Sequence, residues 1–184
     1  MTLQTRNVAT KIEKRILVDA DVISHFISGG QFGLLPHIFH YKKVLLDIVA
    51  NELRASRKFK TYIDNVTRTG FIEEIHFQGK KEVLIEYAKL IRTFGKGESA
   101  CMAYCKFNKD FLASSNLRDI SKYCEENEIS YLTTMDLLVE ALKTKQLTEQ
   151  ECDEFIIKVK VAGSKLPVNC VAAYMLNFKI RTII

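Results

Sequence analysis

The chain has 184 residues, of which 47% are hydrophobic and two are proline, and it carries a formal net charge of +5. A chain of this length and composition is expected to fold as one globular domain with a substantial core. The charge permits a polyanionic partner without establishing one, and no apolar run approaches the roughly eighteen residues that span a bilayer, so we expect no contact with a membrane.

The N-terminus and the cysteines indicate the compartment. Residues 1–14, MTLQTRNVATKIEK, lack the apolar core of a secretory signal. The five cysteines form no CxxC motif, which argues against a disulfide framework and a zinc ribbon. Cys101 and Cys105 are one helical turn apart, but no second pair completes a tetrahedral site, so core packing is favoured. We therefore expect a cytoplasmic protein with reduced cysteines.

Short apolar runs in the first third of the chain predict two buried strands. Residues 16–18 form a continuous apolar run that ends at Asp19, and residues 43–47, KVLLD, have the same form. Both are typical of strands buried on two faces of a parallel sheet. Residues 22–40 between them predict two short helices broken by a glycine pair. Residues 48–60, IVANELRASRKFK, predict one amphipathic helix with a basic outer face.

The rest of the chain continues the alternation of strand and helix. Three further strands are predicted at residues 71–77, 110–115 and 130–134. Helices are predicted over residues 81–94, from the Gly-rich segment FGKGES to about Phe107, and in the tail over residues 148–160 and 168–177. Thr148 and Glu151 have the spacing of a capping box.

This alternation predicts an α/β fold. Short apolar strands separated by helices form a parallel sheet sandwiched between layers of helices, with right-handed crossovers. No linker, internal repeat or low-complexity segment interrupts the sequence. The whole chain, residues 1–184, is therefore expected to be a single domain with a central, mostly parallel sheet of about five strands.

Four acidic residues follow the predicted strands or begin the helices after them: Asp19, Glu52, Glu98 and Asp119. Loops and helix N-termini converge at the carboxyl edge of such a sheet, where function gathers. An acid in a first helical turn, such as Asp119 or Asp136, is also commonly a cap or a dipole partner. Asp19 differs because it ends an apolar strand and would be desolvated unless it were paired or bound to a cation.

A cluster of carboxylates at one edge predicts a divalent cation. Carboxylates packed together raise one another's pKa unless a cation neutralises them. Oxygen ligands without nearby His or Cys favour Mg²⁺ or Mn²⁺, which bind phosphate oxygens, activate water and stabilise the leaving oxygen of an in-line displacement. The residues therefore suggest phosphodiester hydrolysis at a site with Asp19, Glu52, Glu98 and Asp119 as metal ligands.

Basic residues near the acidic segments predict contacts with a nucleic-acid backbone. The alternative interpretation is that they form solvated helix faces, and the sequence leaves both open. The residues of this kind that we expect to bind nucleic acid are Arg15, Arg54, Lys96 and Arg118.

Four segments in order resemble the PIN-domain nucleases. ILVDADVI resembles the first motif of that family, and VLLDIVANEL resembles its strand, loop and acidic helix. GKGESACMAYC is similar to the GxGE-plus-small-residue helix of one bacterial and archaeal subgroup, and YLTTMDLLVEALKTKQLT resembles that subgroup's closing strand and helix. The likeness covers residues 15–147, so residues 148–184 would be a C-terminal helical extension.

The resemblance carries expectations about fold, activity and partners. It implies a Rossmann-like three-layer αβα sandwich, metal-dependent endoribonuclease activity on an RNA substrate, frequent homodimers, and often a role as the toxin of a toxin–antitoxin pair with an antitoxin protein as partner. Asp19, Glu52 and Glu98 match acidic metal-site positions of the family.

The fourth acidic position departs from the family pattern. The subgroup commonly has an Asp pair after the fourth strand, where this chain has Ser115 and Asn116. Both residues can offer neutral oxygens to the pocket, and Asp119 can reach back toward the metal. The loss of a carboxylate should weaken a second metal. We interpret Asp21 as a helix-start cap or as a group that supports the metal ligands.

Two alternatives stay open from the residues. Asp19 and Asp21 also fit the first motif of haloacid-dehalogenase-type phosphatases, as nucleophile and general acid, although no acidic pair follows a late strand. The second alternative is a catalytically weakened PIN-like module that binds RNA or a protein partner and has no appreciable affinity for metal.

Overall fold

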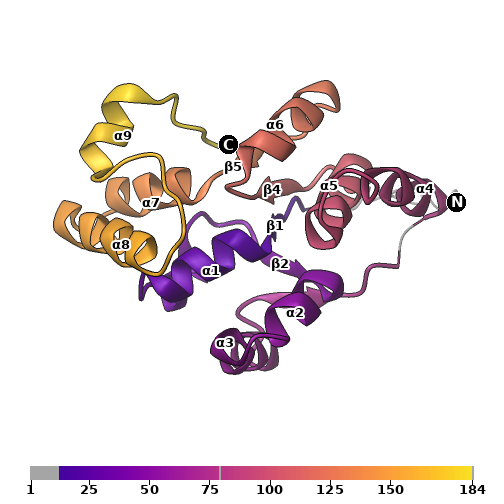
Figure 1. Cartoon of the computed structure of the whole chain (residues 1–184), viewed down its shortest axis with the longest axis horizontal. Coiled ribbons are helices and arrows are strands. Elements are labelled where there is room, and N and C mark those ends of the chain that lie inside the picture. The colour runs from indigo at the N-terminus through magenta and orange to yellow at the C-terminus, as the bar shows by residue number, and fades with distance from the viewer. Residues whose placement is uncertain (1–12, 79, 184) are drawn as a thin grey trace, which may run out of the picture.

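The computed structural model describes residues 13–78 and 80–183, and it contains one five-stranded sheet whose strands are all parallel (Figure 1). The strand order is β3-β2-β1-β4-β5. The strands are β1 (Ile16–Val18), β2 (Lys43–Leu46), β3 (Glu73–Ile75), β4 (Phe111–Ala113) and β5 (Tyr131–Leu132). Helices flank the sheet, so the prediction of an αβα sandwich with a parallel sheet of about five strands is confirmed.

Helices connect the strands and follow the last one. They are α1 (Ala20–Ser28), the 3₁₀ helix η1 (Phe32–His37), α2 (Asp47–Arg54), α3 (Arg57–Arg68), α4 (Lys81–Leu90), α5 (Lys96–Asn108), α6 (Leu117–Glu126), α7 (Thr134–Lys143), α8 (Glu149–Val161) and α9 (Val171–Asn177). The break at the glycine pair between α1 and η1 is confirmed, as is the capping box that Thr148 and Glu151 form at the start of α8.

The single helix predicted over residues 48–60 is wrong, because two helices occupy this segment. Ser56 adopts an extended backbone, with φ of −90° and ψ of 122°, and precedes α3 as its N-cap residue. Serine favours this position, where helical geometry has not yet begun. The bend brings α3 back against α2, where Arg54 at the end of α2 pairs with Asp64 of α3 at 2.8 Å.

The helices form two layers around the central strands. In Figure 1, α1 and α8 lie beside α7 on one side of the sheet, and the three helices pack against one another. On the other side, α5 contacts β1, β2 and β4, and α4 and α6 pack against it. The strands β1, β2 and β4 are buried throughout, which explains why all their residues except Lys43 are apolar.

The tail helices and the cysteines complete the core. Helix α8 packs on α1, where Phe155 lies against Phe26, and α9 packs on α7 and α8. All five cysteines are free, and Cys101 and Cys105 are buried in α5, as the prediction of core packing requires. In the described ranges 13–78 and 80–183, no helix combines the length and the apolar character needed to cross a membrane.

Candidate active site

Asp19 lies at the carboxyl end of the central strand β1. Its backbone N–H donates to Ala113 O of β4 at 2.9 Å, and its side chain accepts a hydrogen bond from Ala20 N at 2.8 Å, so it is the N-cap of α1. The residue is only 6% exposed. Burial, and then the neighbouring Asp21 carboxylate, raises the pKa of Asp19. The charged form of Asp19 is therefore disfavoured by its surroundings.

Asp21 is the second acid of this edge, and it is half-buried. Its Oδ2 accepts the backbone N–H of Ser115 at 2.7 Å and lies 3.5 Å from Ser114 Oγ. Partial burial raises the pKa of Asp21, and the Ser115 hydrogen bond opposes this shift. The N-cap of α1 is Asp19, but Asp21 Oδ1 accepts the Val22 N–H in the first turn of α1 at 2.6 Å, so Asp21 contacts both the helix start and the loop that follows β4.

Glu98 enters the site from the first turn of α5. It is buried, and its Oε1 atom has no hydrogen-bond partner in the described part of the chain. Burial raises the pKa of Glu98 to about 7, with further contributions from the charges of Asp119 and Asp21. A buried carboxylate oxygen without a partner is costly. Glu98 thus fits a position that an added cation would stabilise.

Glu52 reaches the same edge from α2, and Gly97 lies between it and Asp19. A Cβ atom on Gly97 would lie 3.0 Å from Glu52 Oε2, 3.3 Å from Val49 Cγ2 and 3.8 Å from Asp19 Oδ1. The two carboxylates therefore face the same small space over the start of α5. Only a residue without a side chain leaves that space open.

Asp119 and Asn116 close the group from the start of α6. Asn116 Nδ2 donates to Asp119 Oδ2 at 2.8 Å, and Asp119 lies near enough to raise the pKa of Glu98. Asp119 is half-buried and Asn116 is exposed. The structure thus brings segments following β1, β2 and β4 and preceding β4 to one edge, as the sequence predicted.

The carboxylate oxygens at this edge are the ligand type that a hard divalent cation prefers, but their present positions do not form a coordination site. Across residues 13–78 and 80–183, no three His, Cys, Asp or Glu side chains approach one another closely enough to ligate one metal ion as they stand. Asp19 and Glu98 are buried, whereas Glu52 is exposed and Asp119 half-buried, so the last two have freedom to turn. Metal ligation would require the outer acids to move toward the buried ones.

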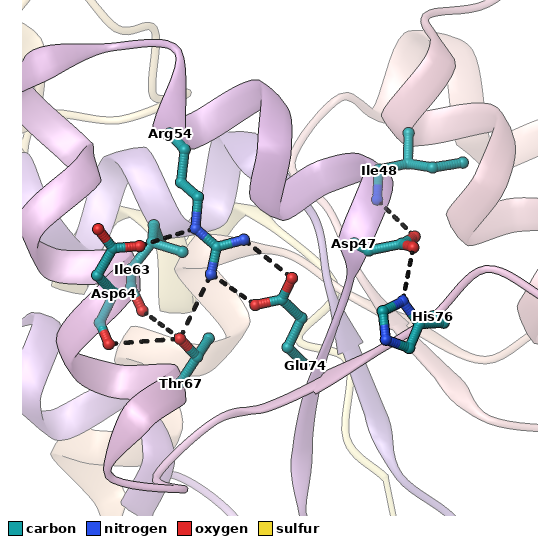
Figure 2. A network of polar contacts seen from close by, with 8 residues as sticks. All are labelled: Asp47, Ile48, Arg54, Ile63, Asp64, Thr67, Glu74 and His76. Carbon is teal, nitrogen blue, oxygen red and sulfur yellow. Dashed lines mark hydrogen bonds and ion pairs between the residues drawn. The ribbon is translucent and has the colours of Figure 1, made fainter.

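The predicted basic residues divide into two pairs, and the first pair is held by carboxylates elsewhere. Arg15 precedes β1 and binds Asp110 at 2.7 Å, at the amino edge of the sheet, away from Asp19. Figure 2 shows the Arg54 guanidinium between Asp64 of α3 and Glu74 of β3, which it contacts at 2.8 and 2.6 Å. Both arginines have structural partners, and the structure does not bring Arg15 to the acids.

The second pair of basic residues lies beside the acids. Lys96 is exposed two residues before Glu98, and Arg118 is exposed one residue before Asp119. Cations beside a carboxylate site at the start of two helices can contact an anionic backbone without blocking the site. These two residues therefore fit the predicted nucleic-acid-binding role by position.

Two buried residues near the acids, His25 and Thr134, had no functional role in the sequence-based prediction. His25 lies one turn after Asp21 in α1, and its Nδ1 is 2.8 Å from Thr134 Oγ1 at the start of α7. Ser115 Oγ is 2.8 Å from the same hydroxyl. The spacing of four between Asp21 and His25, which places both on one face of a helix, is the only sequence signal of this connection. Asp136, considered as a cap, is confirmed as the partner of Thr133 in a capping box.

Comparison with known proteins adds no relative. A scan of the chain against protein-family models and a search of curated proteins each found no match.

Proposed function

We propose that this chain is a PIN-like, Mg²⁺- or Mn²⁺-dependent ribonuclease that hydrolyses phosphodiester bonds at the carboxyl edge of its sheet. The observation that supports this most is the burial of Asp19 and Glu98 near the half-buried Asp21, with Glu98 Oε1 lacking a partner in the described residues. Acids buried side by side are unfavourable in the absence of a cation.

Each residue has a part in this proposal. Asp19, Glu52 and Glu98 would hold the metal ion, and Asp119 would be a weaker fourth ligand whose orientation Asn116 sets. The ion would supply Lewis-acid activation of the phosphodiester and of water. Asp21 would hold the loop at Ser115 rather than bind the ion, because its Oδ2 is engaged by the Ser115 N–H.

The basic residues would define how RNA approaches. Lys96 and Arg118 are exposed at the starts of α5 and α6, close in sequence to Glu98 and Asp119. Phosphates next to the scissile bond would pair with these cations, while the scissile phosphate would face Asp19 and Glu98. Such contacts with the backbone carry no sequence information, so the affinity should fall steeply with salt.

A second candidate function is binding of RNA without hydrolysis. It is favoured by one observation, the absence of three gathered metal-binding side chains in the ranges 13–78 and 80–183. In that case the protein would bind RNA equally well with a chelator present, and Asp19→Asn would leave the RNA affinity unchanged, because Asp19 is buried below the surface that phosphates approach.

Cleavage of mixed RNA with Mn²⁺ tests the proposal. The wild type should produce fragments that EDTA abolishes, and Asp19→Asn and Glu98→Gln should each lose activity by at least about a hundredfold, because each removes a negatively charged metal ligand. Activity equal in all three proteins would refute the proposed site. Binding of RNA without cleavage by any of them would favour the binding module.

A further inference from the structure

A continuous chain of hydrogen bonds runs from Asp21 to His25 through two other segments. Asp21 Oδ2 accepts the N–H of Ser115 in the loop after β4 at 2.7 Å. Ser115 Oγ accepts Thr134 N at 2.9 Å and donates to Thr134 Oγ1 at 2.8 Å. Thr134 Oγ1 is 2.8 Å from His25 Nδ1. The chain therefore returns to α1, one turn beyond the residue at which it started.

The hydrogen bonds of this chain favour one tautomer of His25. The Ser115 hydroxyl donates its one proton to Thr134 Oγ1. The Thr134 hydroxyl has its own proton to donate, and His25 Nδ1 can accept it at 2.8 Å. Nδ1 accepts only in the neutral ring that carries its proton on Nε2. Burial favours that neutral form, since it lowers the pKa of His25 to about 4.

Residues 114–116, the loop in the middle of this series of hydrogen bonds, contain the neutral polar groups of the site. Ser115 lies between Ser114, whose hydroxyl is beside Asp21, and Asn116, whose amide binds Asp119. Fixing the Ser115 side chain on Thr134 fixes where its N–H points and where Asn116 begins. Thr134 is fully buried and His25 is buried, so water competes little for the hydrogen bond between them.

We propose that His25 is a positioning residue of the active site: through Thr134 and Ser115 it holds the loop of residues 114–116, from which the Ser115 N–H binds Asp21 and the Asn116 amide binds the outer ligand Asp119. This inference rests on the proposed metal-dependent function. His25 does not touch substrate or metal in this scheme. Removing a residue that orients metal ligands through hydrogen bonds, without itself binding the metal, typically lowers metal affinity by about ten- to a hundredfold.

Isosteric and conservative variants separate the hydrogen bond from packing. His25→Phe keeps the ring volume without an acceptor, whereas His25→Asn can place a side-chain oxygen near the position of Nδ1. Thr134→Val keeps the shape of the side chain without the hydroxyl, whereas Thr134→Ser keeps the hydroxyl. His40→Phe, at an exposed histidine before β2, is the matched control.

The experiment measures two quantities in each folded variant: hydrogen exchange of the Ser115 amide by NMR without metal, and Mn²⁺ affinity by calorimetry. His25→Phe and Thr134→Val should speed exchange by about tenfold and weaken Mn²⁺ binding by about tenfold. His25→Asn, Thr134→Ser and His40→Phe should stay near the wild type. Nitrogen NMR of the wild type should show an unprotonated Nδ1 on His25.

Three results would overturn the inference. The first is wild-type exchange and affinity in both His25→Phe and Thr134→Val. The second is His25→Asn behaving like His25→Phe, because packing rather than the hydrogen bond would then matter. The third is a wild type that binds Mn²⁺ while its His25 carries a proton on Nδ1. A wild type that binds no Mn²⁺ would instead refute the proposed function, and with it any positioning for a metal.

Discussion

Glu52 and Asp19 face each other across Gly97: a Cβ atom at this glycine would lie 3.0 Å from Glu52 Oε2 and 3.8 Å from Asp19 Oδ1. We predict that Gly97→Ala displaces the Glu52 side chain, which is exposed and free to move, and so weakens Mn²⁺ binding by about tenfold. Stability should stay equal or rise by up to about 1 kcal/mol, because alanine favours the helix over glycine.

Gly95→Ala is the matched control for this prediction. Gly95 lies two residues earlier in the same segment, and a Cβ there would meet nothing within 4 Å. Calorimetric titration with Mn²⁺ and thermal unfolding of both variants provide the comparison. Equal Mn²⁺ affinity in the two alanine variants would show that Glu52 is not a ligand at this place.

Stability without metal should depend on pH through the buried acids. The pKa of Glu98 is raised to about 7 by burial and by Asp119, and that of Asp19 is raised by burial and by Asp21. The folded state therefore binds more protons than the unfolded state above the ordinary carboxyl pKa. In EDTA, protonation of Glu98 stabilises the folded state by about 3 kcal/mol below about pH 4, and this stabilisation is lost as the pH rises through 7.

Urea unfolding between pH 5 and pH 8 checks this slope. Glu98→Gln should flatten it, and Mn²⁺ should abolish it in the wild type by compensating the charges. Stability that rises with pH over this window in EDTA would contradict the account of repelling, buried acids.

Substitutions of Lys96 and Arg118 should affect RNA binding, whereas substitution of Arg15 should affect stability. Lys96→Gln and Arg118→Gln, made together with Asp19→Asn to prevent cleavage, should each weaken RNA binding and reduce its salt dependence by about one counterion. Arg15→Gln should leave RNA affinity unchanged but destabilise the fold by about 3 kcal/mol, because Asp110, whose side chain is 1% exposed, would lose its cation. Fluorescence anisotropy at several salt concentrations and urea unfolding measure the two effects.

Asp136 should matter for stability far more than its counterpart in the next helix. Its buried carboxylate accepts bonds from the Thr133 N–H and hydroxyl, the Tyr174 hydroxyl and the Arg181 N–H, and so fastens the C-terminal segment to α7. Asp136→Ala should cost about 3 kcal/mol or more by leaving buried donors unpaired. Glu151→Ala, in the exposed capping box of α8, should cost much less in the same urea titration.

The order of the fold could be predicted because it is encoded locally. Each central strand is apolar apart from Lys43, and each ends where a polar segment begins a helix, so β1, β2 and β4 and the positions of Asp19 and Glu98 follow from period and turn residues alone. The break at Ser56 is not predicted because the amphipathic pattern continues through it, although a serine at this position is a common N-cap and the Arg54–Asp64 pair stabilises the bend.

The contacts within the site depend on residues distant in the chain. The sequence places Arg15 and Arg54 near acids, but it does not say which acids, and Asp110 and Glu74 bind them away from the site. His25 meets Thr134 across 109 positions, for which no local pattern exists. The homodimer and the antitoxin partner stay predictions.

Anomalous diffraction from crystals grown with Mn²⁺ tests the central claim most directly, because it locates the ion. We predict one strong peak at the carboxyl end of β1, bound by Asp19 and Glu98, with Glu52 turned toward it and Ser115 N–H still on Asp21. The absence of a peak at this edge at saturating Mn²⁺, or a peak bound only by surface acids elsewhere, would contradict the account.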